Sequence, residues 1–240
     1  MKVAVVGCLH GELHTVYRVI QYIEQTQGYK IDLVLCCGDF QAVRDTRDLR
    51  FMTVPPKYLR LGDFPDYFEG RATAPVPTIF VGGNHEASAH LWELFNGGWV
   101  AHNIWYLGHA GVVNFGGLRI AGWSGIYKAH EFQRGYVPVT EESCDESNIY
   151  AAYHVREYHE FLLSQITHHV DVFLSHDWPR GAVENGNKAA VCGKKHWGPA
   201  DLETVTNIPM RNILDRIQPN YWFAAHHHIK HAALFKVNKK

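Results

Sequence analysis

The stretch VAVVGCLHGEL, residues 3–13, joins a short apolar run to a loop that contains a cysteine and a histidine two residues apart. An unbroken run of valine and alanine is typical of a strand that is covered on both faces of its sheet. Gly7 ends the run, so Cys8 and His10 follow the carboxyl end of the strand. Cysteine and histidine side chains are common metal ligands, and open α/β sheets place their ligand sites at this end of the strands. The stretch therefore predicts an α/β fold with a metal site.

The same pattern recurs along the chain. Further apolar runs that predict strands are residues 31–37, 78–81, 118–125, 170–175, 221–225 and 229–237. Between them, apolar residues three or four positions apart predict helices with one buried face. These stripes are Leu13, Val16, Tyr17, Ile20 and Ile23; Val155, Tyr158, Leu162 and Ile166; and Met210, Ile213, Leu214 and Ile217. The alternation of strands and helices is typical of an α/β sheet.

The composition limits the classes of function. A chain of 240 residues with 46% hydrophobic content suits one large domain. Its formal net charge of -1 provides no general field for nucleic acid or an anionic membrane, so any polyanion must be bound locally. The five cysteines do not suit a disulfide framework, which predicts a reducing, intracellular compartment. No apolar segment approaches the length of a membrane span, and we expect a soluble protein with no membrane contact.

Potential metal ligands follow five of the predicted strands. A pair of divalent ions about 3.5 to 4 Å apart needs roughly seven or eight ligand atoms, one carboxylate among them shared by both ions. The residues that match this requirement are Cys8, His10, Asp39, Asn84, His176, His226 and His228. Taken singly, each has a simpler interpretation, such as a turn at Asp39 or a structural histidine at His176. His227 should point away from its two neighbours, because side chains alternate along an extended segment.

The order of these motifs resembles that of the calcineurin-like metallophosphoesterases, with Cys8 at the position where that superfamily usually has an aspartate. One branch shares this cysteine. Longer segments resemble the RNA lariat debranching enzymes, and the resemblance runs from residue 1 to about residue 235. The segments are GCLHGEL, CCGDFQAVRD, VPPKY, GGNHEAS, GGWVAHNIWYLG, SGIYK, YHVREY, FLSHDWP and YWFAAHHH.

The resemblance implies a metallophosphoesterase-type β-sandwich flanked by helices, with the metal site at the carboxyl ends of the strands. It implies one catalytic domain over residues 1–240, with a recognition loop inserted at about 127–150 and the family's C-terminal region absent or truncated. The implied activity is hydrolysis of the 2′,5′-phosphodiester at the branch of excised intron RNA, which leaves linear RNA. The implied partner is branched RNA, bound by a monomer in the nucleus, with the cytoplasm as a second compartment.

The resemblance also implies a role for each matching residue. One pocket would use Cys8, His10, Asp39 and His228, and the other Asp39, Asn84, His176 and His226, so that Asp39 bridges the two. His85 would face the substrate as the catalytic residue, either a general acid or a stabiliser of the transition state. A proton donor to a poor alkoxide leaving group contributes about 10²-fold to 10⁴-fold. Glu86 would orient His85 or place a negative charge at a helix N-terminus.

The cysteine indicates which metals bind. Soft thiolate ligands select zinc or ferrous iron over magnesium. We therefore expect Fe²⁺ and Zn²⁺ as the two cofactors, with Mn²⁺ as a substitute in the laboratory. The alternative is that Cys8 is a small buried residue at the end of a strand.

The segment 127–150 shows neither a helical nor a strand period, and long irregular loops inside compact domains often bind substrate. Single-stranded bases are held by aromatic stacking and by arginine or lysine contacts. The predicted RNA-binding residues are Tyr127, Lys128, Phe132, Arg134 and Tyr136. The alternative is an ordinary surface loop with scattered aromatic residues.

Three other functions compete with debranching. A general dimetal phosphodiesterase would act on small or cyclic nucleotide diesters with the same metals, although the long loop at 127–150 disfavours it. A non-catalytic scaffold would have lost ligands, whereas every expected position is filled here. A repair nuclease is disfavoured by the nearly neutral charge.

Overall fold

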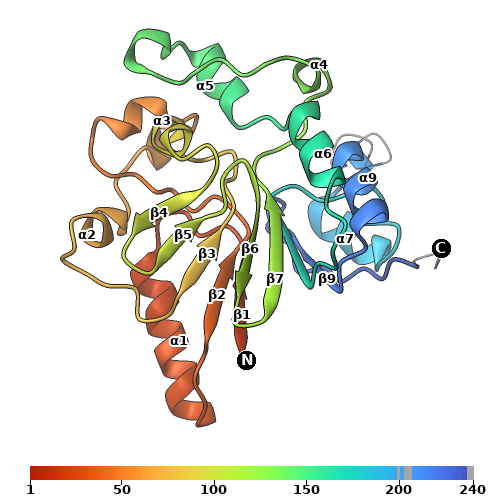
Figure 1. Cartoon of the computed structure of the whole chain (residues 1–240), viewed down its shortest axis with the longest axis horizontal. Helices are drawn as coiled ribbons and strands as arrows, with labels where there is room; N and C mark the ends of the chain where they lie inside the picture. Colours follow the sequence, from red (N-terminus) through yellow and green to blue (C-terminus); the bar gives the residue numbers. More distant parts are fainter. Residues whose placement is uncertain (199–200, 203–206, 237–240) are drawn as a thin grey trace.

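The computed structural model describes residues 1–198, 201–202 and 207–236, and it has two β-sheets packed face to face with helices on both outer sides (Figure 1). The first sheet has the order β1 (Val3–Val6), β2 (Leu33–Cys36), β3 (Thr78–Phe80), β5 (Ile104–Tyr106) and β4 (Gly98–Ala101). The second has the order β6 (Ala110–Phe115), β7 (Leu118–Trp123), β8 (Val172–Ser175) and β9 (Tyr221–Phe223). All neighbouring pairs are parallel except β4 with β5 and β6 with β7.

The period of two along each strand divides the core into layers. In β2, Leu33 and Leu35 belong to the cluster between the two sheets, which also contains Leu174 of β8. Val34 and Cys36 point the other way, into the cluster beneath α1 (Leu13–Gln27). A third cluster lies between the second sheet and the helices α6 (Glu157–Ser164) and α9 (Ile208–Ile217). The result is the β-sandwich flanked by helices that the resemblance implies.

The helices are α1 (Leu13–Gln27), α2 (Phe64–Phe68), α3 (Ser88–Glu93), α4 (Ala129–Phe132), α5 (Glu146–Ala152), α6 (Glu157–Ser164), α7 (Lys188–Lys195) and α9 (Ile208–Ile217). Short 3₁₀ turns are η1 (Asp48–Phe51), η2 (Pro56–Tyr58) and η3 (Glu141–Ser143). Helix α1 ends at Gly28, whose φ of 69° is the left-handed conformation that glycine adopts easily. At the start of α9, the Asn207 side chain accepts a hydrogen bond from the Met210 N–H. Among the helices that the structure describes, none has the length and hydropathy needed to cross a bilayer.

Six of the predicted apolar runs form β1, β2, β3, β7, β8 and β9, and the stripes predicted for α1 and α9 are confirmed. The stripe predicted before β8 is confirmed at Val155 and Ile166, which flank α6 and pack in the third cluster, but it is wrong for the helix itself. Helix α6 buries His159 and Leu163, while Tyr158 and Leu162 are exposed. The prediction took its phase from Val155, which precedes the helix and therefore does not share its period.

Two other regions differ from the sequence prediction. The strand predicted over 229–237 is absent from the described part, where a single bridge joins Ala233 to Gly186, and Val237 lies outside the described residues. Strands β4, β5 and β6 were not predicted. Both β4 and β6 are sheet edges with exposed side chains such as Trp99 and Val112, so they lack the continuous apolar character of a buried strand.

The segment 127–150 is tied to the body of the protein through a buried arginine. Arg156 is 2% exposed, and its guanidinium donates to the carbonyl oxygens of His154 and Ala151, each at 2.9 Å. It also donates at 3.0 Å to Oε2 of Glu131 within the segment, and it lies 4.6 Å from the ring centre of Tyr136. The segment is therefore held by a planar group with several donors, a geometry that lysine cannot reproduce.

We expect Arg156→Lys to lower the free energy of unfolding by about 3 kcal/mol, because it leaves a largely buried carboxylate without its full set of donors. Limited proteolysis should then cut within residues 127–150 much faster than in the original protein. Urea unfolding and timed trypsin digestion measure the two effects.

The matched control is Arg134→Lys, because Arg134 also pairs with Glu131, at 3.3 Å, but its side chain is 68% exposed. Exposed ion pairs contribute about 0 to 1 kcal/mol, so this variant should unfold almost as the original protein does. Equal losses in the two variants would show that Arg156 has no special anchoring role.

Candidate metal centre

The carboxyl ends of five strands meet at one edge of the sandwich. From the first sheet, the loops after β1, β2 and β3 carry Cys8 with His10, then Asp39, then Asn84 with His85. From the second sheet, the loop after β8 carries His176 and the loop after β9 carries His226 and His228. Ligands far apart in the chain are thus brought together because parallel strands end at a common edge.

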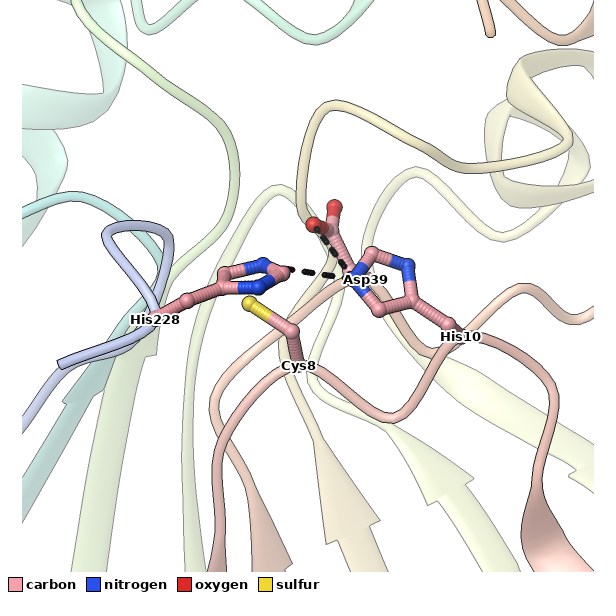
Figure 2. A group of neighbouring side chains, drawn as sticks. All are labelled: Cys8, His10, Asp39 and His228. Atoms are coloured by element: carbon pink, nitrogen blue, oxygen red, sulfur yellow. Dashed lines mark hydrogen bonds and ion pairs between the residues drawn. The ribbon is translucent and has the colours of Figure 1, made fainter. Parts of the chain in front are cut away.

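The first group of side chains consists of Cys8, His10, Asp39 and His228, whose ligand atoms all lie within 4.8 Å of one another. Figure 2 shows them converging from three loops. The Nε2 atoms of His10 and His228 are 3.3 Å apart, and Nε2 of His10 is 3.9 Å from Oδ2 of Asp39. Two imidazoles, a thiol and a carboxylate around one space form a donor set that suits zinc or ferrous iron.

The second group lies on the other side of the same carboxylate. Nε2 of His176 is 3.4 Å from Oδ1 of Asp39 and 3.1 Å from Oδ1 of Asn84. The ring centres of His226 and His176 are 4.9 Å apart. Asp39 therefore directs Oδ1 to one group and Oδ2 to the other, which is the arrangement of a bridging ligand.

The hydrogen bonds of His176 provide a test of whether a cation fits here. Its Nδ1 is 2.8 Å from the carbonyl oxygen of Cys37, which can only accept, so Nδ1 carries the proton. When that is the only proton on the ring, Nε2 presents a lone pair to the carboxylate oxygen of Asp39 at 3.4 Å. Two facing acceptors repel each other unless a cation lies between them. The arrangement fits a bound metal ion, and Cys37 acts as the outer partner that orients the ligand.

Burial controls the protonation of these groups. Burial, together with the neighbouring Asp39 carboxylate, raises the pKa of the Cys8 thiol to about 12. Burial lowers the pKa of His10, and it lowers the pKa of His226 to about 3, so both rings are in the neutral form that binds metals. Burial alone would raise the pKa of Asp39, but His176, His85 and a backbone N–H bring it below its usual value. The rings of His10 and His226 and the carboxylate of Asp39 are already in the protonation states that bind a cation. The Cys8 thiol must release its proton to solvent when a cation binds.

The backbone around the ligands adopts conformations that cost free energy. The φ angles of His10, Asp39, His226 and His228 are 51°, 47°, 63° and 50°, in the left-handed region where residues other than glycine are uncommon. Such conformations cost about 1 to 3 kcal/mol each, and they concentrate at functional sites. These backbone conformations turn the side chains of the four residues from their tight loops toward the metal centre.

Two glycines allow the loops to approach closely. A Cβ added at Gly83 would lie 2.8 Å from Cε1 of His176 and would overlap Oδ1 of Asp39. A Cβ added at Gly38, whose φ is 100°, would lie 2.8 Å from Cγ of His176. Both positions therefore exclude any side chain while the ligands keep their places.

The structure gives Glu86 a different role from the one predicted from the sequence. Its carboxylate accepts hydrogen bonds from the N–H groups of Phe40 at 2.8 Å, Gln41 at 2.7 Å and Gly83 at 2.9 Å. Burial and the neighbouring Asp39 raise its pKa to about 7. Glu86 thus joins the loop after β2 to the loop after β3, instead of orienting His85 or serving a helix end. No local pattern marks this role, because two of its three donors lie 45 and 46 residues away.

His85 lies beside the two groups of candidate ligands. Its backbone N–H donates at 2.9 Å to Oδ1 of Asp39, and its ring centre is 5.3 Å from that of His10. The side chain is half-buried. A ring in this position can reach a substrate bound at the same edge while its backbone holds the shared carboxylate.

The predicted RNA-binding residues occupy two kinds of environment. Lys128 and Arg134 are exposed, whereas the rings of Tyr127 and Phe132 are half-buried, with centres 5.7 Å apart. The hydroxyl of Tyr136 is turned inward, where it donates at 3.1 Å to the carbonyl oxygen of His154. Contact with RNA stays a prediction for all five.

His227 lies outside the first group of ligands, but the alternation predicted for an extended segment is wrong, because His226 and His228 have left-handed φ angles of 63° and 50°. Its ring packs against Trp178, with centres 5.1 Å apart, and its Nε2 is 3.9 Å from Oδ1 of Asp177. Asp177, His226 and His227 form a second cluster of potential ligands. However, Asp177 accepts hydrogen bonds from the N–H groups of Tyr127 and Trp178, at 3.1 and 3.0 Å, so its oxygens already hold the backbone.

Comparisons with known proteins agree with this geometry. The family model for calcineurin-like phosphoesterases matches residues 1–230. The chain is 53% identical over 243 residues to the lariat debranching enzyme of Drosophila melanogaster, which covers 99% of this chain and 45% of that protein. It is 46% identical to the lariat debranching enzyme of Arabidopsis thaliana, over 97% of this chain and 56% of that protein. It is also 46% identical to the lariat debranching enzyme of Homo sapiens, over 100% of this chain and 44% of that protein. The chain thus spans about half the length of these curated relatives.

We expect Gly83→Ala to weaken metal binding by between about 10-fold and 100-fold, the usual effect of disturbing groups that orient metal ligands. The added methyl group must displace Asp39 or His176. Isothermal titration of metal-free protein with Zn²⁺ measures the loss.

The control for this substitution is Gly193→Ala in α7, where an added Cβ meets nothing within 4 Å. Its zinc affinity should equal that of the original protein. A Gly83→Ala protein that bound zinc normally would contradict the close approach of the two loops.

We expect Cys8→Asp to keep the fold and to shift metal preference from zinc toward manganese, because carboxylate oxygen is a harder ligand than thiolate. Elemental analysis after competition between equal Zn²⁺ and Mn²⁺ measures the preference. Cys192→Asp, a change at a half-buried cysteine of α7, is the control. Unchanged selectivity in Cys8→Asp would exclude the thiol as a ligand.

Proposed function

Because the chain belongs to the calcineurin-like phosphoesterase family, we propose that it is a metal-dependent phosphodiesterase that hydrolyses the 2′,5′-phosphodiester branch of lariat RNA to linear RNA. The observation that carries the proposal is the position of Asp39, which directs one oxygen to each of two groups of ligands. Similarity to lariat debranching enzymes over nearly the whole chain supports the choice of substrate.

The proposed cofactors are two divalent ions, Fe²⁺ and Zn²⁺, with Mn²⁺ as a substitute. Cys8, His10, Asp39 and His228 would hold one, and Asp39, Asn84, His176 and His226 the other. When bound, such ions neutralise charge on phosphoryl oxygens and make a water molecule nucleophilic near neutral pH. The softness of the Cys8 sulfur supports the choice of these metals over magnesium.

The protein's own contribution to the reaction is orientation and proton transfer. His85 would donate a proton to the 2′-oxygen as the bond to phosphorus breaks, since an alkoxide is a poor leaving group. Its half-buried ring next to His10 supports this role. Glu86 would hold the loops that carry Asp39 and His85 in fixed relative positions through its three hydrogen bonds with backbone N–H groups.

The segment 127–150 would recognise the branched RNA. Lys128 and Arg134 would contact phosphates, and the rings of Tyr127 and Phe132 would stack on splayed bases. Exposure of the two cations supports the first role. Tyr136 would act less directly, through the packing of its ring near Arg156.

We further propose that residues 1–240 act as one catalytic domain and as a monomer. The apolar cluster shared by the two sheets supports a single folding unit. The proposed compartment is the nucleus, with the cytoplasm as a second location, as suits a substrate that is an excised intron.

We expect a branched 2′,5′ RNA to be hydrolysed at least about 100-fold faster than a linear 3′,5′ RNA of the same sequence, a selectivity of roughly 2.7 kcal/mol in transition-state free energy. Chelation should abolish both reactions. Gel analysis of end-labelled RNA with metal-loaded protein measures the rates. Equal rates on the two substrates would leave a general phosphodiesterase in place of a debranching enzyme.

A further inference from the structure

The segment 54–62, which contains η2, has a composition that differs from that of the rest of the surface. Its sequence is VPPKYLRLG, with two cations and no acidic residue in a chain whose net charge is -1. Residues 55–61 are all exposed. The exposed fractions of Tyr58, Leu59 and Leu61 are 51%, 41% and 40%. An aromatic ring and apolar side chains next to cations are typical of surfaces that bind single-stranded nucleic acid.

Both ends of this segment are fixed to the loops that carry the candidate ligands. At the start, Oγ1 of Thr53 donates at 3.4 Å to the carbonyl oxygen of Asn84. At the end, the N–H of Asp63 donates at 2.8 Å to the carbonyl oxygen of Gly11, the residue after His10. Gly62 packs so closely on Gly11 that a Cβ at either would meet the other's backbone, at 3.1 Å or less. The segment therefore forms part of the rim of the metal centre.

Local contacts restrict the backbone conformation of the segment 54–62. Two prolines, Pro55 and Pro56, restrict the backbone at its start. Nη2 of Arg60 is 2.9 Å from Oε1 of Glu12 in the loop after β1. Nζ of Lys57 lies 4.7 Å from the ring centre of Tyr58, which places a positive charge beside an aromatic face. The ring and the charge are thus presented outward on an anchored turn.

We propose that residues 54–62 bind single-stranded RNA next to the branch, with the Tyr58 ring stacked on a base and Lys57 on a phosphate. This surface is separate from residues 127–150, and the proposal rests on the proposed function for the identity of the substrate. Stacking tolerates any base, because every base has a π face. The segment would then add affinity for RNA strands near the metal centre without reading their sequence.

The test uses metal-loaded protein and a fluorescent branched RNA whose 2′,5′ linkage cannot be cleaved, with binding followed by anisotropy. Tyr58→Ala should weaken binding by about 5-fold to 100-fold, the effect of losing one stacked base. Lys57→Ala should weaken binding and reduce the slope of log affinity against log salt by about 0.7, the value for one phosphate of a single strand. A purely structural role for Lys57 would leave that slope unchanged.

Matched controls come from helix α1 and the loop that follows it, since the far end of α1 lies away from α3 and α5 in Figure 1. Tyr22→Ala removes another exposed tyrosine, which is 66% exposed, and Lys30→Ala removes another exposed cation. Both should bind RNA as the original protein does. Thermal unfolding of all four variants should match that of the original protein, because each change is at an exposed side chain.

The outcomes separate the two proposals. If Tyr58→Ala and Lys57→Ala bind RNA as tightly as the controls, the RNA surface at 54–62 is excluded, whatever the substrate preference. If the original protein cleaves branched and linear RNA at equal rates while Tyr58→Ala still weakens binding, debranching is excluded and the RNA surface stands.

Discussion

The rest of the site depends on the environment of the Asp39 carboxylate. It is 2% exposed and lies between His10 on one side and His176 on the other, with one oxygen toward each. A carboxylate buried so deeply is unfavourable unless positive charge or donors compensate for the lost water. Among the described residues, the compensation comes from the backbone N–H of His85, the thiol of Cys8 and the neighbouring imidazoles. Cations held by the two groups of ligands would compensate the buried charge further.

Holding that carboxylate in place has a conformational cost. Four candidate ligands adopt left-handed backbone angles, and neighbouring loops touch at Gly38 and Gly83, where no side chain fits. The three hydrogen bonds of Glu86 and the bond from His176 to Cys37 offset part of this strain. Because the bonds of Glu86 to Phe40 and Gln41 and that of His176 to Cys37 join different loops, a change at one ligand loop is transmitted to the next. The same dependence explains why small residues are required at positions that carry no chemistry.

Much of the site could be predicted from the sequence because parallel strands end at one edge. The motifs after β1, β2, β3, β8 and β9 therefore had to meet once the runs were recognised as strands. What failed depends on contacts that no local pattern encodes. The buried face of α6 contains His159 as well as Leu163, and His159 packs near Phe95 with ring centres 5.2 Å apart, a contact that the apolar pattern of the helix does not reveal. Glu86 likewise acts on residues more than 40 positions away.

The division of the ligands between two sheets joins metal binding to folding. Cys8, His10, Asp39 and Asn84 come from the first sheet, whereas His176, His226 and His228 come from the second. Their relative positions are fixed by the apolar layer between the sheets, in which Leu35 and Leu174 are fully buried close to the ligand loops. A cation that binds ligands from both sheets draws the sheets together, so its binding free energy adds to that of the apolar layer. The release of the Cys8 proton opposes this gain at low pH, because burial keeps the thiol protonated in the absence of a cation.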